Sequence, residues 1–291
     1  MSPEPVSSAP TLPRGIRFAG FTMIEIAISL AVIGFALVAI IGILPTGMNV
    51  QRENREETII NQDATVLINS IRNGARGGDD LTNYVVAISN YVVRYNATSG
   101  AVDSTPGWLW HTYNGSGPAS FNPGMELTNG TRIVGILSTP RYTPDPVSTN
   151  YYRSNYVVAM IRSMSGPASE KAPQRNASVQ ELALNYRLIT DISPAVPYDP
   201  WQGQFRTTND VDYVAYSNHW AFARNIQSNL HNVRLTFRWP VLPDGRVGGF
   251  RQTYRTELSG RLAAVQDPWH ANRDKTNYFF EARNYVKAPL P

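Results

Sequence analysis

The feature that most constrains this chain is a long apolar run close to its N-terminus. Residues 21–44 contain only three polar side chains, those of Thr22, Glu25 and Ser29. As an α-helix, 24 residues reach about 36 Å, which exceeds the roughly 30 Å hydrocarbon core of a bilayer. The sequence therefore predicts a helix that spans a membrane.

The flanks of the run indicate that it stays in the membrane. A secretory signal peptide has a shorter apolar core, of roughly 7–15 residues, and a cleavage site between small residues. Here the run ends in Ile43-Leu44-Pro45-Thr46-Gly47, which lacks that pattern. Arg14 and Arg17 precede the run, and basic residues keep their side of a membrane protein cytoplasmic. In a bacterium we therefore expect a single-pass inner-membrane protein with its C-terminal domain in the periplasm.

Glu25 is the charged side chain within this run, and its presence in an apolar helix requires an explanation. A carboxylate deep in a membrane helix costs about 2.5–3.5 kcal/mol on insertion scales, so such groups usually have a partner. Cleavage between Gly20 and Phe21 would create an α-ammonium group about one helical turn from Glu25. Glu25 could then neutralise its own amino terminus or that of a neighbouring subunit. The alternative is a stray carboxylate that reaches the lipid headgroups.

The stretch RFAGFTMIEIAISL at 17–30 resembles the processing site of type IV prepilins and type II secretion pseudopilins. In that family a basic leader ends in Gly, Phe usually follows, and Glu is the fifth residue after the cut. The resemblance implies cleavage by prepilin peptidase between Gly20 and Phe21, N-methylation of Phe21, and an assembly ion pair made by Glu25. The implied partners are membrane lipid, other pilin-like subunits bound through the N-terminal helix, and the inner-membrane assembly machinery. The product would be a periplasmic or cell-surface filament.

Two further points refine this resemblance. The family usually has a proline about twenty residues after the cut, whereas Pro45 is the twenty-fifth residue and lies between Gly42 and Gly47. We expect a kink or a locally unwound segment over residues 42–48, because proline removes one helical hydrogen bond. Residues 35–57 also resemble a narrower group of large pilin-like proteins encoded in tandem prepilin cassettes, the Verru_Chthon type.

The sequence past the membrane run predicts an α+β protein. Apolar side chains recur at spacings of three and four residues at Ile60, Ala64, Leu67, Ile68 and Ile71, as on one face of a helix. The glycine-rich stretch at 74–78 should end this helix. The predicted organisation is a leader (1–20), a transmembrane helix (21–45), its amphipathic extension (46–76) and a β-rich extracytoplasmic head (77–291). The helix should pack on an antiparallel sheet with long loops.

Strand patterns occupy much of the head. Alternating or β-branched runs predict strands at 84–88, 91–95, 131–137, 154–161, 182–188, 233–239, 250–258 and 278–285. Asp244-Gly245 between two such runs predicts a hairpin. The segments TNYVVAIS at 82–89 and SNYVVAMI at 154–161 are similar, by coincidence or through an old duplication. Proline- and glycine-rich loops are expected at 96–130, 139–150, 162–178 and 191–210.

Signals of enzyme or metal chemistry are weak. The chain has no cysteine, which excludes disulfides and thiol catalysis, and it carries no nucleotide-binding, metalloprotease or serine-hydrolase motif. Its four histidines fit structural roles, and Asp210 and Asp212 fit a solvated turn better than a calcium site. The net charge of +4 comes from no basic block, so we expect no nucleic acid. With no motif or ligand pattern for them, we also expect no cofactor and no metal.

Three functions remain open at this point. The first is a pilin-like structural subunit that is processed after Gly20 and assembles through its apolar helix into a pilus or secretion pseudopilus. The second is an uncleaved, single-pass, membrane-anchored extracytoplasmic binding module. The third is an anchored enzyme with an unrecognised site. The first explains Gly20, Phe21, Glu25 and the helix together, whereas the second explains only the helix.

Overall fold

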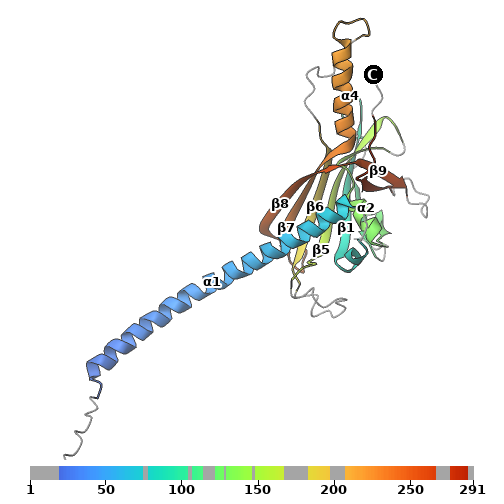
Figure 1. The fold of residues 1–291 in the computed structure, drawn as a ribbon. Helices are drawn as coiled ribbons and strands as arrows, with labels where there is room; N and C mark the ends of the chain where they lie inside the picture. Colours follow the sequence, from blue (N-terminus) through green and yellow to red (C-terminus); the bar gives the residue numbers. More distant parts are fainter. Residues whose placement is uncertain are drawn as a thin grey trace, which may run out of the picture. The chain divides into compact units, whose positions relative to one another are not determined.

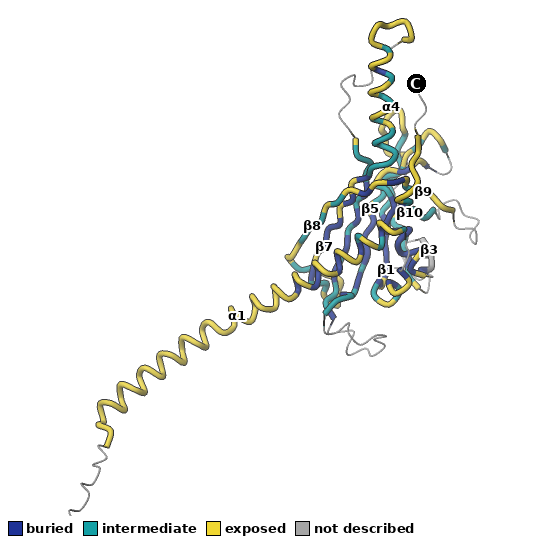
Figure 2. The backbone as a smooth tube through the Cα atoms, viewed as in Figure 1, coloured by how far each residue is buried: buried dark blue, intermediate teal, exposed yellow. Residues whose placement is uncertain are grey.

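A computed structural model of the protein describes residues 20–74, 78–103, 107–113, 122–127, 129–145, 148–166, 183–196, 207–266 and 276–287. One helix, α1 (Met23–Arg72), accounts for the first of these stretches. The chain divides into two compact units between Asn54 and Arg55, so α1 contributes to both. Figure 2 shows its residues before this division as exposed, whereas buried residues appear along its last turns.

The second unit is built on a twisted sheet (Figure 1). Its pairings are antiparallel apart from the parallel pair of β2 and β3. The strands in spatial order are β3 (Asn122–Glu126), β2 (Gly107–Thr112), β1 (Val85–Asn96), β5 (Tyr151–Arg162), β6 (Asn185–Pro194), β7 (Leu230–Val241) and β8 (Val247–Ser259). The short β4 (Tyr142–Pro144) also pairs with β5, and β9 (Arg261–Gln266) and β10 (Thr276–Glu281) form a separate two-stranded sheet.

The core lies between one face of the large sheet and the last turns of α1. The predicted helix stripe is confirmed, since Ile60, Leu67 and Ile71 are fully buried and Ala64 is 1% exposed. These side chains share one apolar cluster with inward-facing residues of β5, β6 and β7, among them Ala159, Leu188, Tyr186, Leu235 and Phe237. Burial of an aliphatic side chain of this size contributes about 1.5–3 kcal/mol. The predicted α+β architecture is thus confirmed.

The end of α1 is fixed by a close backbone approach. Gly74 has φ +60°, a conformation that residues with a side chain rarely adopt, and its amide donates to the carbonyl of Ile71 at 3.2 Å. A Cβ at this position would lie 2.7 Å from the carbonyl oxygen of Phe280 on β10. Glycine at the predicted end of the helix is therefore required both by the turn at Gly74 and by the neighbouring strand β10.

Strand predictions had mixed outcomes. Asp244-Gly245 does form the β7–β8 turn, with Gly245 at φ +81°. The similar segments at 82–89 and 154–161 contribute to β1 and β5, which are antiparallel neighbours with Ile88 opposite Ala159. The predicted strands at 84–88 and 91–95 form one continuous strand, β1. Strand β6 continues to Pro194, beyond the predicted start of the loop at 191.

The predicted strand at 131–137 is wrong, because these residues belong to helix α2 (Gly130–Leu137). The side chain of Asn129 caps it, accepting a hydrogen bond from the amide of Arg132 at 2.8 Å. Ile133, Val134, Ile136 and Leu137 all enter the core, and burial of this apolar face overrides the β propensity of its branched residues. A short 3-10 helix, η1 (Asp79–Asn83), contacts α2.

Other features also differ from expectation. The predicted loop at 96–130 contains β2 and β3, and the predicted loop at 139–150 contains β4. Helix α4 (Tyr213–Asn229) precedes β7 and was not predicted; its only buried side chain is Tyr216, which is 7% exposed. The expected unwinding at 42–48 is absent, since these residues are helical and Pro45 lies inside α1. The missing amide of proline removes one bond to the carbonyl four residues earlier, and the neighbouring turns keep theirs.

Candidate functional site

The N-terminus of α1 is held by a reciprocal pair of side chains. The Thr22 hydroxyl accepts a hydrogen bond from the amide of Glu25 at 3.3 Å. One carboxylate oxygen of Glu25 accepts from the Thr22 amide at 3.1 Å and from the Thr22 hydroxyl at 3.1 Å. This is a capping box, which satisfies two backbone donors that a helix N-terminus otherwise leaves unpaired.

The residues that the sequence predicts to be functional lie at the start of α1 and just before it. Glu25 is in the first turn of α1, while Gly20 and Phe21 precede the helix and are exposed, with Phe21 at 83%. The Gly20–Phe21 peptide bond is therefore accessible in this conformation. Sequence reasoning missed the box, although the Thr-x-x-Glu spacing before an apolar run is its known signature. Glu25 thus has hydrogen-bond partners within its own chain before any cleavage.

The first unit presents an apolar surface along α1. Every residue from 20 to 54 is exposed, including large apolar side chains such as Ile24, Phe35, Ile41 and Leu44. The helix is long and apolar enough to cross a membrane. Exposed apolar area of this extent is rare on soluble monomers and indicates a lipid or helical partner. An N-terminal membrane anchor is thus consistent with the structure.

Within the second unit, a buried carboxylate joins α1 to the sheet. Asp63 is fully buried, and its Oδ2 accepts hydrogen bonds from the Tyr186 hydroxyl at 3.0 Å and from the Met164 amide at 2.9 Å. Burial raises the pKa of Asp63, although hydrogen bonds from Ser165, Met164 and Tyr186 oppose that shift. Burial and the neighbouring Asp63 charge raise the pKa of Tyr186. These contacts fix the rotation of the amphipathic half of α1 over β6.

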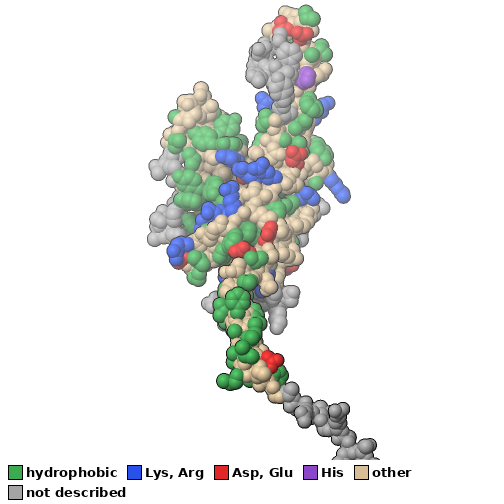
Figure 3. Space-filling model, turned by 90° about the vertical axis from the view of Figure 1, so that its left-hand side faces the viewer, with side chains coloured by type: hydrophobic (Ala, Val, Ile, Leu, Met, Phe, Trp, Pro, Cys, Tyr) green, Lys and Arg blue, Asp and Glu red, His purple; other side chains and the backbone are tan. Residues whose placement is uncertain are grey.

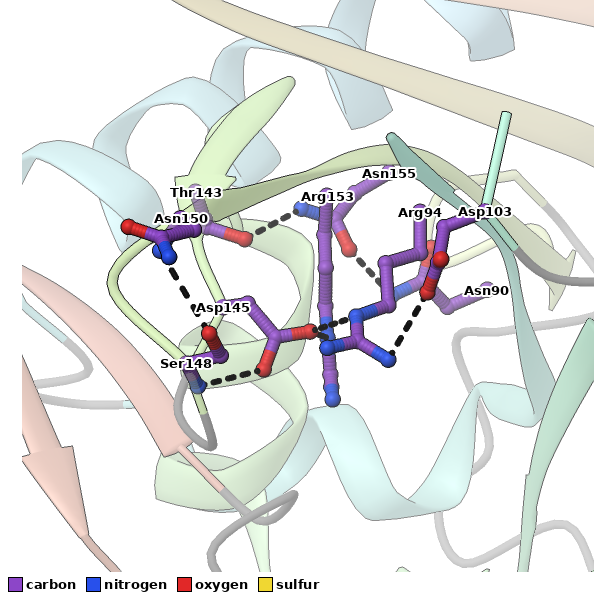
Figure 4. A network of polar contacts seen from close by, with 9 residues as sticks. All are labelled: Asn90, Arg94, Asp103, Thr143, Asp145, Ser148, Asn150, Arg153 and Asn155. Carbon is purple, nitrogen blue, oxygen red and sulfur yellow. Dashed lines mark hydrogen bonds and ion pairs between the residues drawn. The ribbon is translucent and has the colours of Figure 1, made fainter. Parts of the chain in front are cut away.

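A second polar cluster joins β1, β4 and β5 (Figure 4). Asp145, whose side chain is 1% exposed, pairs with Arg94 at 2.7 Å and with Arg153 at 3.1 Å. Arg94 also pairs with Asp103 at 3.1 Å and lies over the ring of Tyr151, 4.1 Å from its centroid. Two arginines and two carboxylates thus balance each other. The cluster holds the first residues of β5 against β1 and the end of β4, and its charges are engaged internally.

The cluster continues through amide side chains. Asn155 donates to the Thr143 hydroxyl and to the carbonyl of Pro140, each at 3.0 Å. It also accepts from the amide group of Asn90 at 3.1 Å. These bonds connect Pro140, which precedes β4, and Thr143, which belongs to β4, to the centre of the sheet. They support a structural role for the whole cluster.

The other sequence candidates are dispersed. Asp210 and Asp212 lie in the turn before α4, where the Asp210 carboxylate accepts from the Thr207 amide at 3.0 Å. Within the described stretches no three His, Asp or Glu side chains are placed to hold a metal ion. His231 is buried edge-on against Phe280, and burial lowers its pKa. His111 is buried on β2, His219 is exposed on α4, and His270 lies outside the described residues.

Comparisons with protein-family models, curated proteins and solved structures found no match to this chain. Assignment of a function therefore depends on the residues and geometry of the chain itself. The two features with functional content are the capped, apolar α1 and the exposed surface of the head.

Proposed function

We propose that this chain is a pilin-like structural subunit, processed by prepilin peptidase after Gly20 and assembled through α1 into a pilus or secretion pseudopilus. In this proposal the helix holds the uncut subunit in the inner membrane with its head in the periplasm. After cleavage and N-methylation at Phe21, the same apolar surface packs against the helices of neighbouring subunits.

The observation that carries the proposal is the combination of a Gly20–Phe21 junction, an acidic first turn and an exposed apolar helix. The junction lies outside the helix and is exposed, as a protease substrate must be. The thirty-odd residues that follow bury nothing within their own chain. A plain membrane anchor requires apolarity alone, whereas the junction and Glu25 are both explained by processing and assembly.

A second candidate is favoured by the capping box. Because the Thr22 hydroxyl and amide already bond to Glu25, the carboxylate has a local role in an uncut chain. An uncleaved, membrane-anchored binding module would need Glu25 only to start its helix. The two candidates therefore differ in what the carboxylate must do, and in whether residues 1–20 remain.

Processing is tested by intact mass and N-terminal sequencing of protein extracted from membranes that contain prepilin peptidase. We expect loss of 20 residues and a methylated Phe21. Gly20→Val should leave the precursor uncut, since a β-branched side chain would have to enter a cleft shaped for glycine. Ser29→Val, a β-branched change beyond the junction, is the matched control. A precursor that keeps its leader in the wild type would favour the membrane-anchored module.

The role of Glu25 is tested by comparing Glu25→Gln with Glu25→Ala. Glutamine can complete a capping box but carries no charge, so it separates the cap from the ion pair. Adjacent helices can be crosslinked through cysteine pairs introduced at 30–44, because the chain has no native cysteine. We expect both variants to be cleaved normally and both to fail to crosslink. Wild-type crosslinking by Glu25→Gln would show that only the cap matters.

A further inference from the structure

The large sheet has a second face, turned away from the core, which is rich in arginine and tyrosine. Residues directly opposite in an antiparallel register share a face. Because Tyr186, Leu188, Leu235 and Phe237 point into the core, their neighbours along each strand point away from it. This outward face therefore follows from the register of β1 and β5–β8.

Five outward side chains on β6–β8 form an arginine cluster. Arg187, Arg238 and Arg251 are directly opposite one another across three strands, and Arg234 is opposite Arg255. Neighbouring strands are about 4.8 Å apart, so each row brings guanidinium groups within reach of one polymer chain. All except the half-buried Arg187 are exposed. Figure 3 shows basic side chains gathered across the head.

The outward face of β1, β4 and β5 carries a tyrosine cluster. Tyr91 is opposite Tyr156, Tyr95 is opposite Tyr152, and Tyr142 of β4 is opposite Ser154. Tyr142, Tyr152 and Tyr156 are 53%, 45% and 46% exposed, respectively. Large exposed aromatic side chains gathered in this way mark binding surfaces more often than chance packing. They offer flat rings and hydroxyl groups beside the arginine cluster.

Asp191 brings a carboxylate into the arginine cluster, opposite Arg234. The Nε of Arg187, a donor, and the Oδ1 of Asp191, an acceptor, are shielded from solvent and lack a hydrogen-bond partner among the described residues. The other oxygen of Asp191 pairs with Arg234 and, at 3.4 Å, with Arg141. The Asp191 carboxylate is thus ion-paired within the head.

Carboxylates within the arginine cluster separate two kinds of polyanion. Asp191 and the exposed Glu257 occupy the same face as Arg234 and Arg255. A phosphate backbone offers no hydrogen-bond donors to these carboxylates. The hydroxyl groups of a sugar can donate to them, while its acidic groups pair with the guanidinium groups. The exposed Thr253, whose hydroxyl lies 3.2 Å from that of the buried Thr236 between the two arginine rows, adds a further partner.

We propose that this face of the head binds an acidic polysaccharide, with uronic acid carboxylates on the arginine cluster and sugar rings against the tyrosine cluster. The inference does not depend on cleavage of the leader or on assembly of α1. Failure of either would leave the predicted binding intact, and loss of this binding would leave processing intact.

The test uses full-length protein in detergent micelles and polygalacturonate oligomers of defined length as the probe. Binding is measured by biolayer interferometry at two salt concentrations. We expect saturable binding that weakens as salt rises, because exposed charges are screened. Arg238→Gln with Arg251→Gln should weaken binding by about tenfold, from two surface ion pairs. Tyr152→Leu with Tyr156→Leu should weaken it without changing the salt dependence.

Controls keep this test decisive. Arg261→Gln with Arg283→Gln removes the same charge from exposed positions off the β6–β8 strands and should leave affinity unchanged. Methyl-esterified polygalacturonate, which has lost its charge, should bind far more weakly. No binding by the wild type, or equal losses in the cluster and control variants, would overturn the proposal. Tighter, arginine-dependent binding of an oligothymidylate would instead make the face a nucleic-acid surface.

Discussion

The two halves of α1 share one secondary structure but face different surroundings. From Met23 to Asn54 every side chain is exposed, whereas from Arg55 to Arg72 seven residues are buried by the head. Up to residue 48 the first half is apolar on nearly all sides, whereas the second half is polar except for one stripe. A helix that is apolar all round needs a nonaqueous partner, while an amphipathic one needs a single packing face. One helix thus combines a segment whose apolar surface suits contact with lipid or other helices and a segment that packs on its own sheet.

Because of this difference, burial of the two halves contributes to two different free energies. Burial of Ile60, Leu67 and Ile71 stabilises the head itself, through apolar surface removed from water. The exposed apolar side chains before residue 50 contribute nothing of this kind within one chain, and their burial is available to a membrane or a neighbouring subunit. Substitutions in the two halves should therefore register in different measurements.

The largest expected effect comes from Leu67→Ala. Leu67 is fully buried in the core, and loss of a buried leucine side chain typically costs about 2–5 kcal/mol. Ile33→Ala removes similar apolar volume from the exposed half, where Ile33 is 54% exposed, and should leave the head unchanged. The measurement is urea unfolding in detergent micelles, followed by tryptophan fluorescence. Equal losses in the free energy of unfolding from both substitutions would contradict this division of α1 into two halves.

The next effect concerns Pro45 in the exposed half. Pro45→Ala restores an amide that can donate to the carbonyl of Ile41, and proline in a helix interior costs about 3 kcal/mol relative to alanine. We expect slower amide hydrogen exchange over residues 42–48 and unchanged exchange over 59–71. Slower exchange across both segments would mean that the two halves open together.

The smallest effect is a change in pH dependence from Asp63→Asn. Because the folded pKa of Asp63 is raised, its protonated form is favoured by folding. Its contribution to stability is therefore fully present below the ordinary aspartate pKa and is lost as pH rises through the folded value. Asparagine keeps the acceptor for Tyr186 and Met164 but has no charge.

For this variant we expect stability at neutral pH to change by about 1 kcal/mol or less. The fall in stability between the ordinary aspartate pKa and the raised one should be smaller than in the wild type. Urea unfolding across that pH window measures it, with Asp210→Asn at an exposed turn as the control. A wild-type pH profile in the Asp63→Asn protein would show that Asp63 does not titrate in that window.

Much of the architecture could be predicted because its signals are local. The apolar run, the stripe from Ile60 to Ile71, the glycine stop at Gly74 and the Asp244-Gly245 turn each depend on a few neighbouring residues. The two faces of β7 were also readable, since Val233, Leu235, Phe237 and Trp239 alternate with polar residues.

The remainder depends on contacts between distant segments. Residues 131–137 have strand propensity, yet they form α2 because the core accepts all four of its large apolar side chains. The arginine cluster required the register of three strands, since Arg187 and Arg251 are far apart in the sequence. Asp63 appeared as one polar residue on a helix, and its partners Met164 and Tyr186 lie beyond the reach of any local pattern.

The hydrogen bonds that Asn61 accepts from Gln252 and Tyr254 span 191 and 193 positions, respectively. At ordinary rates of synthesis, roughly 10–40 s separate the appearance of these partners. The apolar half of α1 needs no contact with the sheet, whereas the stripe that follows it must wait for β6–β8. During that interval the nascent chain carries an apolar helix face without its sheet. The order of synthesis therefore leaves the stripe within residues 59–71 uncovered until the C-terminal strands of the sheet have been made.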